Sequence, residues 1–233
     1  MKNFLCSEYQ LDAEKISIIP NGLSDALPVP ANDKDSLRRK WRMNTREPLL
    51  LFVGRLHPVK GLRFLISAFR KVLDTFPDCR LIIAGNGDYD TYLQEAKDIC
   101  SKVSFTGLLE KKDLHELYQI ADIGILPSLT ENCSYVAIEM MMHGLPMITA
   151  AASGLTEMTE DGISGLQVPL IEHPDKVEID TEVLAEKMMY LLQHPAETKE
   201  MGQNGRTRYL KKYSLDVFRS SMLNFYQSLF PDS

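Results

Sequence analysis

Two glutamates, eight residues apart, are the acidic side chains of this chain best placed to face one ligand. Glu131 lies in the polar loop TENCSY, and Glu139 lies in the apolar segment that follows this loop. Ser134 is a good first residue for a helix, and Gly144 is a good residue to end it. A short apolar run stopped by Pro127 precedes the loop and predicts a strand. Both glutamates are therefore expected at the carboxyl end of that strand, the edge at which open α/β sheets bind ligands.

A purely structural interpretation of the two glutamates stays open at this point. Glu131 would then be a favourable charge ahead of the positive end of a helix, and Glu139 a solvated surface residue. Two features favour a functional site. Glu139 is flanked by Ile138 and by three consecutive methionines, so its helix is expected to be buried on most sides, and a buried acid needs a partner. The loop also carries more small polar groups than a turn requires.

Two cations follow another expected strand, Leu49–Val53. That strand ends at Gly54 and Arg55, and the next helix opens with Lys60 and Gly61. Glycine lets the backbone approach a ligand closely, and a helix start presents free N–H groups. A planar guanidinium and a flexible ammonium together suit the oxygens of a diphosphate. From this segment alone, Arg55 paired with a surface carboxylate and Lys60 in solvent remain an equal alternative.

Small residues also end the other expected strands. Gly85 and Gly87 occur in the sequence AGNG, which lacks the third glycine of a dinucleotide fingerprint, so a nicotinamide-dependent oxidoreductase is poorly supported. A tight turn explains these glycines equally well. The segment Thr106–Leu109 would offer backbone groups and an apolar wall to a flat base. Ser153–Gly154, ahead of a short helical turn with Glu157, would place further N–H groups in the crevice.

The elements that must position these residues alternate between strands and helices, which predicts βαβ units and a parallel sheet covered on both faces. Residues 24–48 are expected to be a linker with one charged helical patch. The expected strands are Ile16–Ile19, Leu49–Val53, Arg80–Ala84, Val103–Thr106, Ile123–Leu126, Pro146–Ala150 and Gly165–Pro169. The expected helices are Lys34–Trp41, 62–73, Tyr89–Cys100, Lys112–Ile120, 134–142, 181–193, 196–211 and 215–229.

The composition indicates a soluble enzyme domain. With 233 residues, 44% of them hydrophobic, the chain can bury a sizeable core. A net charge of −6 argues against nucleic acid or an anionic membrane as the main partner. No apolar run approaches the ~20 residues of a membrane span, and the amino terminus is no signal peptide. The four cysteines lack zinc-like spacing, which indicates reduced cytosolic thiols, and no motif pairs Cys133 with a histidine.

Several motifs occur in one order at fitting spacings. They are Gly54-Arg55 with Lys60-Gly61, Gly85-x-Gly87, Phe105-x-Gly107, Pro127-Ser128, Glu131-x7-Glu139, Gly144-x-Pro146 and Gly162-x-x-Gly165. This order resembles the carboxyl-terminal, donor-binding domain of retaining GT-B glycosyltransferases of family 4, the "glycosyl transferases group 1" domain. The resemblance covers nearly the whole chain, because Ile19–Gly22 is similar to the family's interdomain junction and Met201–Ser214 to its closing helices. It implies one half of a GT-B fold, a Rossmann-like parallel sheet with helices on both faces.

The resemblance also implies roles for single residues. Arg55 and Lys60 would bind the diphosphate of a nucleotide-sugar and stabilise its charge as it leaves, and Glu131 would lie near the donor sugar hydroxyls. Glu139 would hydrogen-bond the ribose, and the segment around Leu108 would flank the base. The implied catalytic residues are Arg55, Lys60 and Glu131, and the implied ligand-binding residues are Gly54, Gly85, Gly87, Leu108, Ser134, Tyr135, Val136 and Glu139.

The implied activity is glycosyl transfer (EC 2.4 class) from a UDP, GDP or ADP sugar with retained anomeric configuration. The two cations would serve in place of a metal ion, and no other cofactor is expected. The family usually has an aromatic residue and a glycine where this chain has Cys133 and Ser134, so Ser134 is expected to narrow the space beside the sugar. A non-catalytic nucleotide-binding or regulatory module of the same fold remains the alternative.

The resemblance further implies that an amino-terminal acceptor domain is missing. Residues 1–45 would be the remnant of the interdomain junction and a linker, and residues 46–233 the nucleotide-sugar-binding domain. The chain alone is then expected to be inactive and cytoplasmic, or peripheral to a membrane through the missing domain. An apolar stripe at helical spacing near the carboxyl end, with Phe4 and Leu5, would lack its cover and favour a homodimer. The stripe contains Leu215, Phe218, Met222, Phe225, Tyr226 and Leu229.

Overall fold

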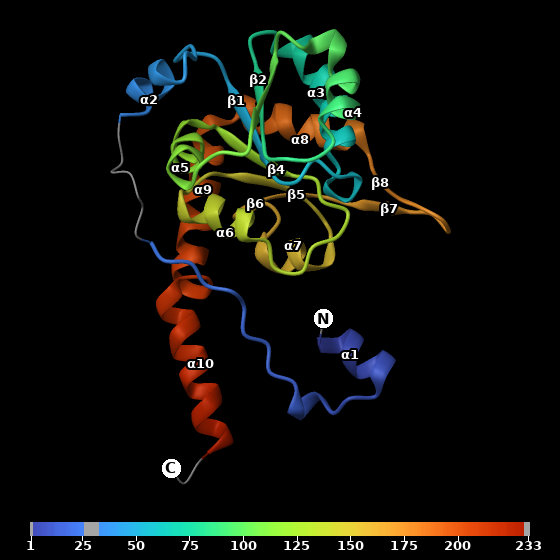
Figure 1. Cartoon of the computed structure of the whole chain (residues 1–233), viewed down its shortest axis with the longest axis vertical. Coiled ribbons are helices and arrows are strands. Elements are labelled where there is room, and N and C mark those ends of the chain that lie inside the picture. The colour runs from blue at the N-terminus through green and yellow to red at the C-terminus, as the bar shows by residue number, and fades with distance from the viewer. Residues whose placement is uncertain (1, 26–32, 231–233) are drawn as a thin grey trace.

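The computed structural model describes residues 2–25 and 33–230, and its centre is a six-stranded sheet (Figure 1). The strands lie in the order β3-β2-β1-β4-β5-β6, and all neighbouring pairs are parallel. Their bounds are β1 Leu49–Val53, β2 Arg80–Ala84, β3 Val103–Gly107, β4 Ile123–Leu126, β5 Met147–Ala150 and β6 Gly165–Val168. This strand order is that of the Rossmann fold, in which the direction of winding reverses between β1 and β4.

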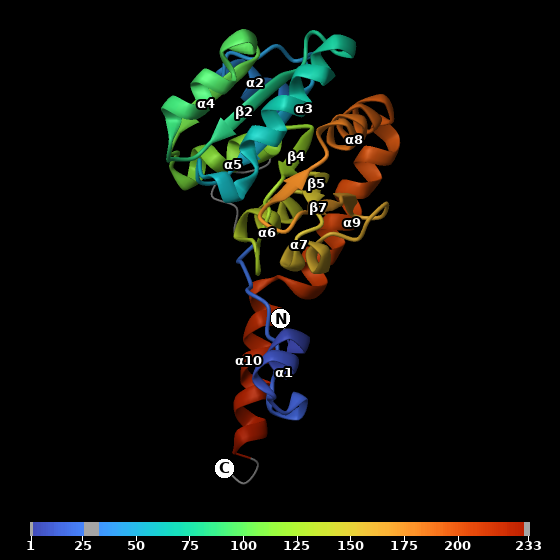
Figure 2. The same ribbon diagram turned by 90° about the vertical axis from the view of Figure 1, so that its right-hand side faces the viewer.

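Helices cover both faces of this sheet. The helices of the described residues are α1 Lys2–Tyr9, α2 Lys34–Lys40, α3 Leu62–Thr75, α4 Tyr89–Glu95, α5 Lys111–Ile120, α6 Tyr135–Met142, α7 Ser153–Met158, α8 Thr181–Gln193, α9 Pro195–Lys212 and α10 Leu215–Leu229. Of these, α1 and α10 lie away from the sheet (Figure 2). The described ranges also contain the short 3₁₀ turns η1 Ala13–Lys15, η2 Pro58–Lys60 and η3 Lys97–Ile99. The α/β fold predicted from the sequence, a Rossmann-like parallel sheet with helices on both faces, is confirmed.

The central strand β1 shows why the sheet is buried on two sides. Leu50 and Phe52 point into a core shared with α3 and α8, whereas Leu49, Leu51 and Val53 point into a core shared with α5 and α6. Alternate side chains of a strand face opposite sides of a sheet, so a continuous apolar run needs a cover on each. The run LLLFV therefore specifies a central parallel strand.

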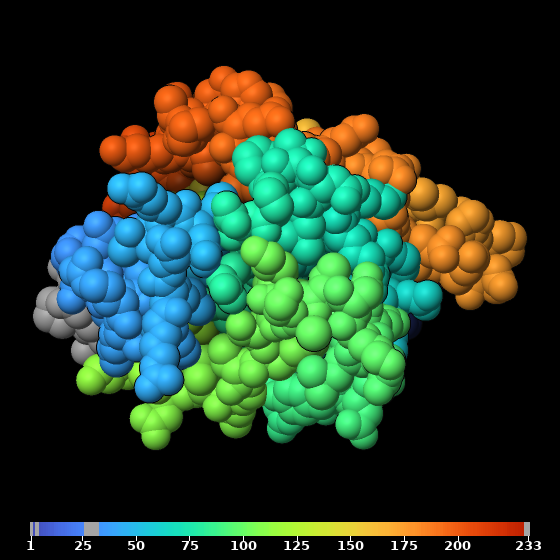
Figure 3. All heavy atoms as spheres, turned by 90° about the horizontal axis from the view of Figure 1, so that it is seen from above, coloured from blue at the N-terminus to red at the C-terminus, as the bar shows by residue number. Residues whose placement is uncertain are grey.

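The structure differs from the sequence prediction in four places. Ile16–Ile19 forms no strand, since no neighbouring strand pairs with it in the described part of the chain. The helix expected over Tyr89–Cys100 breaks after Glu95 and continues as η3. Helix α1 was not expected. Neither was the antiparallel hairpin of β7 (Leu170–Glu172) and β8 (Val177–Ile179), whose part of the chain projects from one side of the body in Figure 3.

The helical patch within the expected linker, α2, packs against α5. Arg38 is buried and donates to the carbonyl of Ile120 and to Asp122, at 2.9 and 2.7 Å. Lys40 donates to both carboxylate oxygens of Glu116 at 2.7 and 2.6 Å. These long-range polar contacts attach α2 to the sheet domain. Residues 26–32 of the expected linker lie outside the described residues.

Helix α10 projects from the body of the molecule, and the amino-terminal segment lies on the same side (Figures 1 and 2). None of its residues is buried, and Leu223 and Tyr226 are 62% and 55% exposed. Leu5 is half-buried, and the side chain of Phe4 lies outside the described part of the chain. Leu23 bonds through its backbone to Tyr213 and Leu215, which connects this segment to the start of α10. In the described ranges no helix is both long enough and apolar enough to cross a membrane.

Candidate functional site

The sequence-predicted residues come together at the carboxyl edge of the sheet. The strand order reverses between β1 and β4, and ligands of such sheets bind in the crevice at this point. The loop after β1 carries Lys60, and the loop after β4 carries Glu131. The two best candidates for chemistry therefore flank the crevice that the topology creates.

Lys60 and Glu131 form an ion pair across this crevice, from the Lys60 ammonium to Oε1 of the carboxylate. Both side chains are mostly buried, with 19% and 18% of their surface exposed. The hydroxyl of Ser128 donates to the same carboxylate oxygen at 3.4 Å. A partly buried pair held in this way keeps a cation and an anion in fixed positions before any ligand arrives.

The two loops that carry this pair are held together by their backbones. Gly61 has a left-handed conformation (φ +68°), and a Cβ atom at this position would lie 1.8 Å from the carbonyl oxygen of Pro127. The N–H of Leu129 donates to the carbonyl of Val59 at 2.8 Å. Only glycine permits this approach, so Gly61 is what brings Lys60 against the loop of Glu131.

The backbone of Glu131 is fixed from the other side by the start of α7. Its carbonyl oxygen accepts from the N–H of Gly154 at 2.9 Å and from the hydroxyl of Ser153 at 3.1 Å. The expectation that Ser153–Gly154 would offer N–H groups to a ligand is therefore wrong for the amide of Gly154. This amide instead satisfies a carbonyl of the loop and holds Glu131 in place.

The glycines after β1 and β2 pack against each other. A Cβ atom on Gly85 would lie 1.8 Å from the carbonyl oxygen of Gly54, and one on Gly87 would lie 2.4 Å from that of Leu56. Leu56 also donates its N–H to the carbonyl of Asn86 at 2.8 Å. Glycine is therefore needed at positions 85 and 87 because the turns after β1 and β2 approach each other closely. Their contact with a ligand, and that of Gly54, stays a prediction.

Helix α6 begins at the crevice with Ser134 as its cap. The Ser134 hydroxyl accepts from the N–H of Ala137 at 3.3 Å, and the Ser134 N–H lies 3.3 Å from the sulfur of Met158. The hydroxyl is therefore engaged inside the helix start, and the narrowing of the space beside a sugar by Ser134 stays a prediction. The N–H groups of Tyr135 and Val136 have no intrahelical partner, as at any helix start, and no hydrogen bond to them is found in the described residues.

Glu139 has the partner that its partly buried position requires. The hydroxyl of Tyr118 on α5 donates to Oε2 of Glu139 at 2.7 Å. Burial raises the pKa of the Glu139 carboxyl, and this shift is partly opposed by the Tyr118 hydrogen bond and the charge of Lys111. Sequence reasoning missed Tyr118, because it lies on the apolar face of its helix, 21 residues before Glu139. No spacing rule joins two residues on different helices.

Arg55 and Leu108 are exposed at the same edge. The Arg55 side chain makes no hydrogen bond or ion pair with another described residue, so the surface carboxylate considered as its partner is not found. Leu108, directly after β3, is 80% exposed. A free guanidinium and an apolar side chain at the rim are thus available to a ligand.

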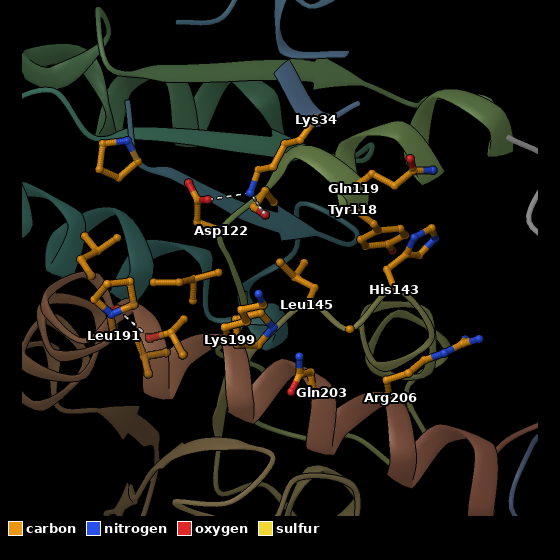
Figure 4. Close-up of a pocket in the computed structure, with 18 of the residues that line it drawn as sticks. Lys34, Tyr118, Gln119, Asp122, His143, Leu145, Leu191, Lys199, Gln203 and Arg206 are labelled. Atoms are coloured by element: carbon orange, nitrogen blue, oxygen red, sulfur yellow. Dashed lines mark hydrogen bonds and ion pairs between the residues drawn. The ribbon is translucent and has the colours of Figure 1, made fainter. Parts of the chain in front are cut away.

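A large cavity lies at the opposite, amino edge of the sheet (Figure 4). It has a volume of about 1070 Å³, and Pro48, Ile123 and Pro146 at the starts of three strands line it. Lys34 and Asp122 form an ion pair at 2.7 Å in its wall. None of the sequence-predicted site residues lines this groove, so its size alone does not make it the candidate site.

A smaller cavity of about 200 Å³ lies near the candidate site, beside Cys133 and Asn132. Ile19 and Tyr213 line its other side, so it separates the amino-terminal segment from the loop of Glu131. All four cysteines are free thiols. Within residues 2–25 and 33–230, no group of three or more histidine, cysteine, aspartate or glutamate side chains is arranged to hold a metal ion.

Residues 33–208 match the family described as "Glycosyl transferases group 1". An uncharacterised glycosyltransferase of Methanocaldococcus jannaschii is 28% identical over 236 residues, which cover 97% of this chain and 57% of that protein. The GDP-mannose-dependent monoacylated alpha-(1-6)-phosphatidylinositol monomannoside mannosyltransferase of Corynebacterium glutamicum is 30% identical, over 90% of this chain and 55% of that protein. The chain thus spans little more than half the length of these relatives.

Solved structures agree with this assignment. Sucrose-phosphate synthase from Thermosynechococcus elongatus superposes with a TM-score of 0.83 at 27% identity, over 100% of this chain and 57% of that one. HepE of Anabaena in complex with UDP superposes with a TM-score of 0.80 over 95% of this chain and 60% of that one. At 21% identity, the second likeness concerns the fold alone. Because the family match extends over most of the chain, this chain belongs to the glycosyl transferases group 1 family.

Proposed function

We propose that this chain is the nucleotide-sugar-binding domain of a retaining GT-B glycosyltransferase of family 4. The bound ligand is a nucleoside diphosphate sugar, and the reaction moves its sugar to an acceptor hydroxyl. In this proposal residues 46–233 form the binding domain and residues 1–45 the junction and linker. The observation that carries the proposal is the Lys60–Glu131 pair, set at the crevice where the strand order reverses.

The diphosphate lies between the two cations and the start of α6. Lys60 exchanges its contact with Glu131 for phosphate oxygens, and the exposed guanidinium of Arg55 closes on the same group. The N–H groups of Tyr135 and Val136 point toward it from a helix start, where anions are favoured. When the sugar–phosphate bond breaks, its electron pair stays on the diphosphate, and these fixed donors stabilise the added charge without reorganising solvent.

The two glutamates recognise the two ends of the donor. Glu131, released from Lys60, accepts from hydroxyls of the sugar, while its backbone stays fixed by Gly154. Glu139 accepts from the ribose hydroxyls, and the exposed side chain of Leu108 covers one face of the base. A carboxylate is suited to both tasks, because it accepts hydrogen bonds and donates none.

Similar proteins support a nucleoside diphosphate sugar as donor. The relative from Corynebacterium glutamicum is described as GDP-mannose-dependent, and HepE of Anabaena has been solved with UDP and with UDP-glucose. The two cases carry different bases. The proposal therefore extends to the diphosphate, the ribose and a sugar, and not to a particular base.

We further propose that the chain by itself binds the donor without transferring its sugar. It matches little more than half of each longer relative. The other part of those proteins would supply the acceptor side of the cleft. A non-catalytic binding module of the same fold predicts the same donor binding, and only reconstitution with the missing part separates the two.

A thermal-unfolding panel tests the proposed ligand. UDP, GDP, ADP and their sugar conjugates are compared with NAD at equal concentration. A nucleotide present at one hundred times its Kd would stabilise the chain by about 2.7 kcal/mol, seen as a rise in Tm. At least one nucleoside diphosphate is expected to produce this rise, and NAD is not. Stabilisation by NAD alone, or by none of the nucleotides, would contradict the proposal.

A further inference from the structure

Tyr118 lies directly behind the carboxylate that the proposed function assigns to ribose. It is 2% exposed, and its hydroxyl donates to Oε2 of Glu139 at 2.7 Å. Tyr118 belongs to the end of α5, and Glu139 to the middle of α6. The hydrogen bond therefore joins the end of α5 to the middle of α6.

Two histidines hold the phenol ring in one orientation. The ring of His143 stacks on Tyr118, with centroids 5.3 Å apart and planes 30° apart. The ring of His115 meets Tyr118 edge-on, with centroids 6.3 Å apart. Ring nitrogens of the two histidines are themselves hydrogen-bonded at 2.6 Å. Figure 4 shows His143 beside Tyr118 at one end of the amino-edge groove. A ring packed in this way directs its hydroxyl without searching other rotamers.

The contact leaves one oxygen of Glu139 for a ligand. Oε2 accepts from Tyr118, while no hydrogen bond to Oε1 is found in the described part of the chain. Glu139 is only partly buried, and Lys111 at the first position of α5 acts on its charge. Fixing one oxygen sets the plane of the carboxylate, and hence the direction in which the other oxygen accepts.

We propose that Tyr118 is a positioning residue for nucleotide recognition, which holds Glu139 so that Oε1 accepts from the ribose hydroxyls. The inference rests on the proposed function of the carboxyl edge. A merely structural tyrosine would use Glu139 only to satisfy its own buried hydroxyl. The two roles predict different effects on affinity when the Tyr118 hydroxyl is removed. Only in the positioning role does this removal weaken ligands that carry ribose hydroxyls and spare ligands that lack them.

The experiment compares a ribonucleotide with its 2′,3′-dideoxy analogue by calorimetric titration. The probe is UDP, GDP or ADP, whichever binds most tightly to the wild-type chain. The variants are Tyr118→Phe, Glu139→Gln and the two combined. Tyr209→Phe is the matched control, because Tyr209 is also fully buried and its hydroxyl also makes one hydrogen bond, to the carbonyl of Leu23 at 2.9 Å.

Tyr118→Phe is expected to weaken ribonucleotide binding about threefold to tenfold, the range for one lost hydrogen bond, and to leave the dideoxy analogue unchanged. In the Glu139→Gln background the same substitution should have no further effect, since the carboxylate that it positions is gone. Tyr209→Phe should lower Tm without altering the ratio of the two affinities. If Tyr118→Phe does not fold, the ratio of the two affinities is measured with Tyr118→Met, a flexible replacement without a hydroxyl.

The experiment distinguishes failure of this inference from failure of the proposed function. If Glu139→Gln selectively weakens the ribonucleotide but Tyr118→Phe affects both ligands equally, or neither, the positioning role of Tyr118 is overturned. If Glu139→Gln itself does not distinguish the two ligands, the ribose assignment of Glu139 fails, and the inference fails with it. If no nucleoside diphosphate binds the wild-type chain, the proposed function is overturned as well.

Discussion

Lys60 and Glu131 are paired across the crevice at which the strand order of the sheet reverses. Each belongs to a loop that follows a central strand, and the close approach of Gly61 to Pro127 sets the two loops against each other. A ligand that binds in this crevice must replace Glu131 as the partner of Lys60, or Lys60 as the partner of Glu131. A diphosphate satisfies the cation and a sugar hydroxyl satisfies the carboxylate, so a nucleotide-sugar replaces both halves of the pair at once.

The two glutamates should respond differently to ligands with and without a sugar. Glu131→Gln is expected to weaken only sugar conjugates, because its carboxylate meets the sugar. Glu139→Gln is expected to weaken free nucleoside diphosphate and conjugate alike, because both carry ribose. Losses of ~1.5–3 kcal/mol are expected for hydrogen bonds to a charged group. Calorimetric titration of each variant with UDP, GDP or ADP and the matching sugar conjugate measures both effects.

Equal losses for the diphosphate and the conjugate in Glu131→Gln would contradict this division. Glu197→Gln is a suitable control, since Glu197 makes a carboxylate–tyrosine contact, with Tyr190, as Glu139 does with Tyr118, but lies on the exposed surface of α9. Its affinities should match those of the wild type for every ligand.

His143 should make the stability of the chain sensitive to mild acid. Burial, followed by the nearby His115 and Arg206, lowers the pKa of His143 from 6.5 to about 4. As the pH falls, His143 is therefore protonated near pH 6.5 in the unfolded chain but only near pH 4 in the folded chain. Stability from this residue is present above pH 6.5 and is lost as the pH falls toward 4, by roughly 3 kcal/mol at most.

Urea unfolding of the wild type and of His143→Phe between pH 7 and pH 4 tests this effect. The phenyl ring keeps a planar group against Tyr118 but cannot take up a proton. The variant should lose less stability than the wild type over this range. Parallel curves would show that His143 does not contribute. Burial also lowers the pKa of His115, so a smaller dependence of stability on pH should remain in both proteins.

Helix α10 should promote self-association of the chain. Leu223 and Tyr226 are 62% and 55% exposed, and Leu229 is also exposed, whereas Phe218 and Met222 of the predicted stripe are half-buried. Exposed apolar side chains gathered on one helix favour contact with another molecule. Light scattering over a range of concentrations should show dimers, and Leu223→Ser with Tyr226→Ser should reduce them. Leu93→Ser on α4, which removes an exposed leucine that lies outside α10, should not. A strictly monomeric wild type at high concentration would refute this prediction.

The strands and most helices could be predicted because local patterns specify them. Leu49–Val53 is apolar throughout and Arg80–Ala84 is apolar after Arg80, and the structure confirms both without a change of bounds. Ile16–Ile19 has the same local character but no strand beside it, so β propensity alone misled. The hairpin of β7 and β8 was missed, because its strands are three residues long and partly polar.

The residues of the candidate site were likewise predictable only in part. Residues at strand ends, such as Lys60 and Glu131, could be found because parallel strands bring their carboxyl ends to one edge. The partner of Glu139 could not be found, because Tyr118 lies on another helix and its type suits an apolar face equally well. The use of the Gly154 amide by Glu131 was also hidden, since it depends on how closely two loops approach.

The most direct test of the account is the location of the bound nucleotide. Calorimetric titration with a nucleoside diphosphate would compare Lys60→Ala and Arg55→Ala at the carboxyl edge with Lys199→Ala, a cation lining the groove at the opposite edge. The account predicts that the first two variants each lose ~1.5–3 kcal/mol of binding free energy, with little loss of stability, and that Lys199→Ala binds as the wild type does. Wild-type affinity in Lys60→Ala and Arg55→Ala, with binding lost in Lys199→Ala, would contradict it and place the nucleotide in the amino-edge groove.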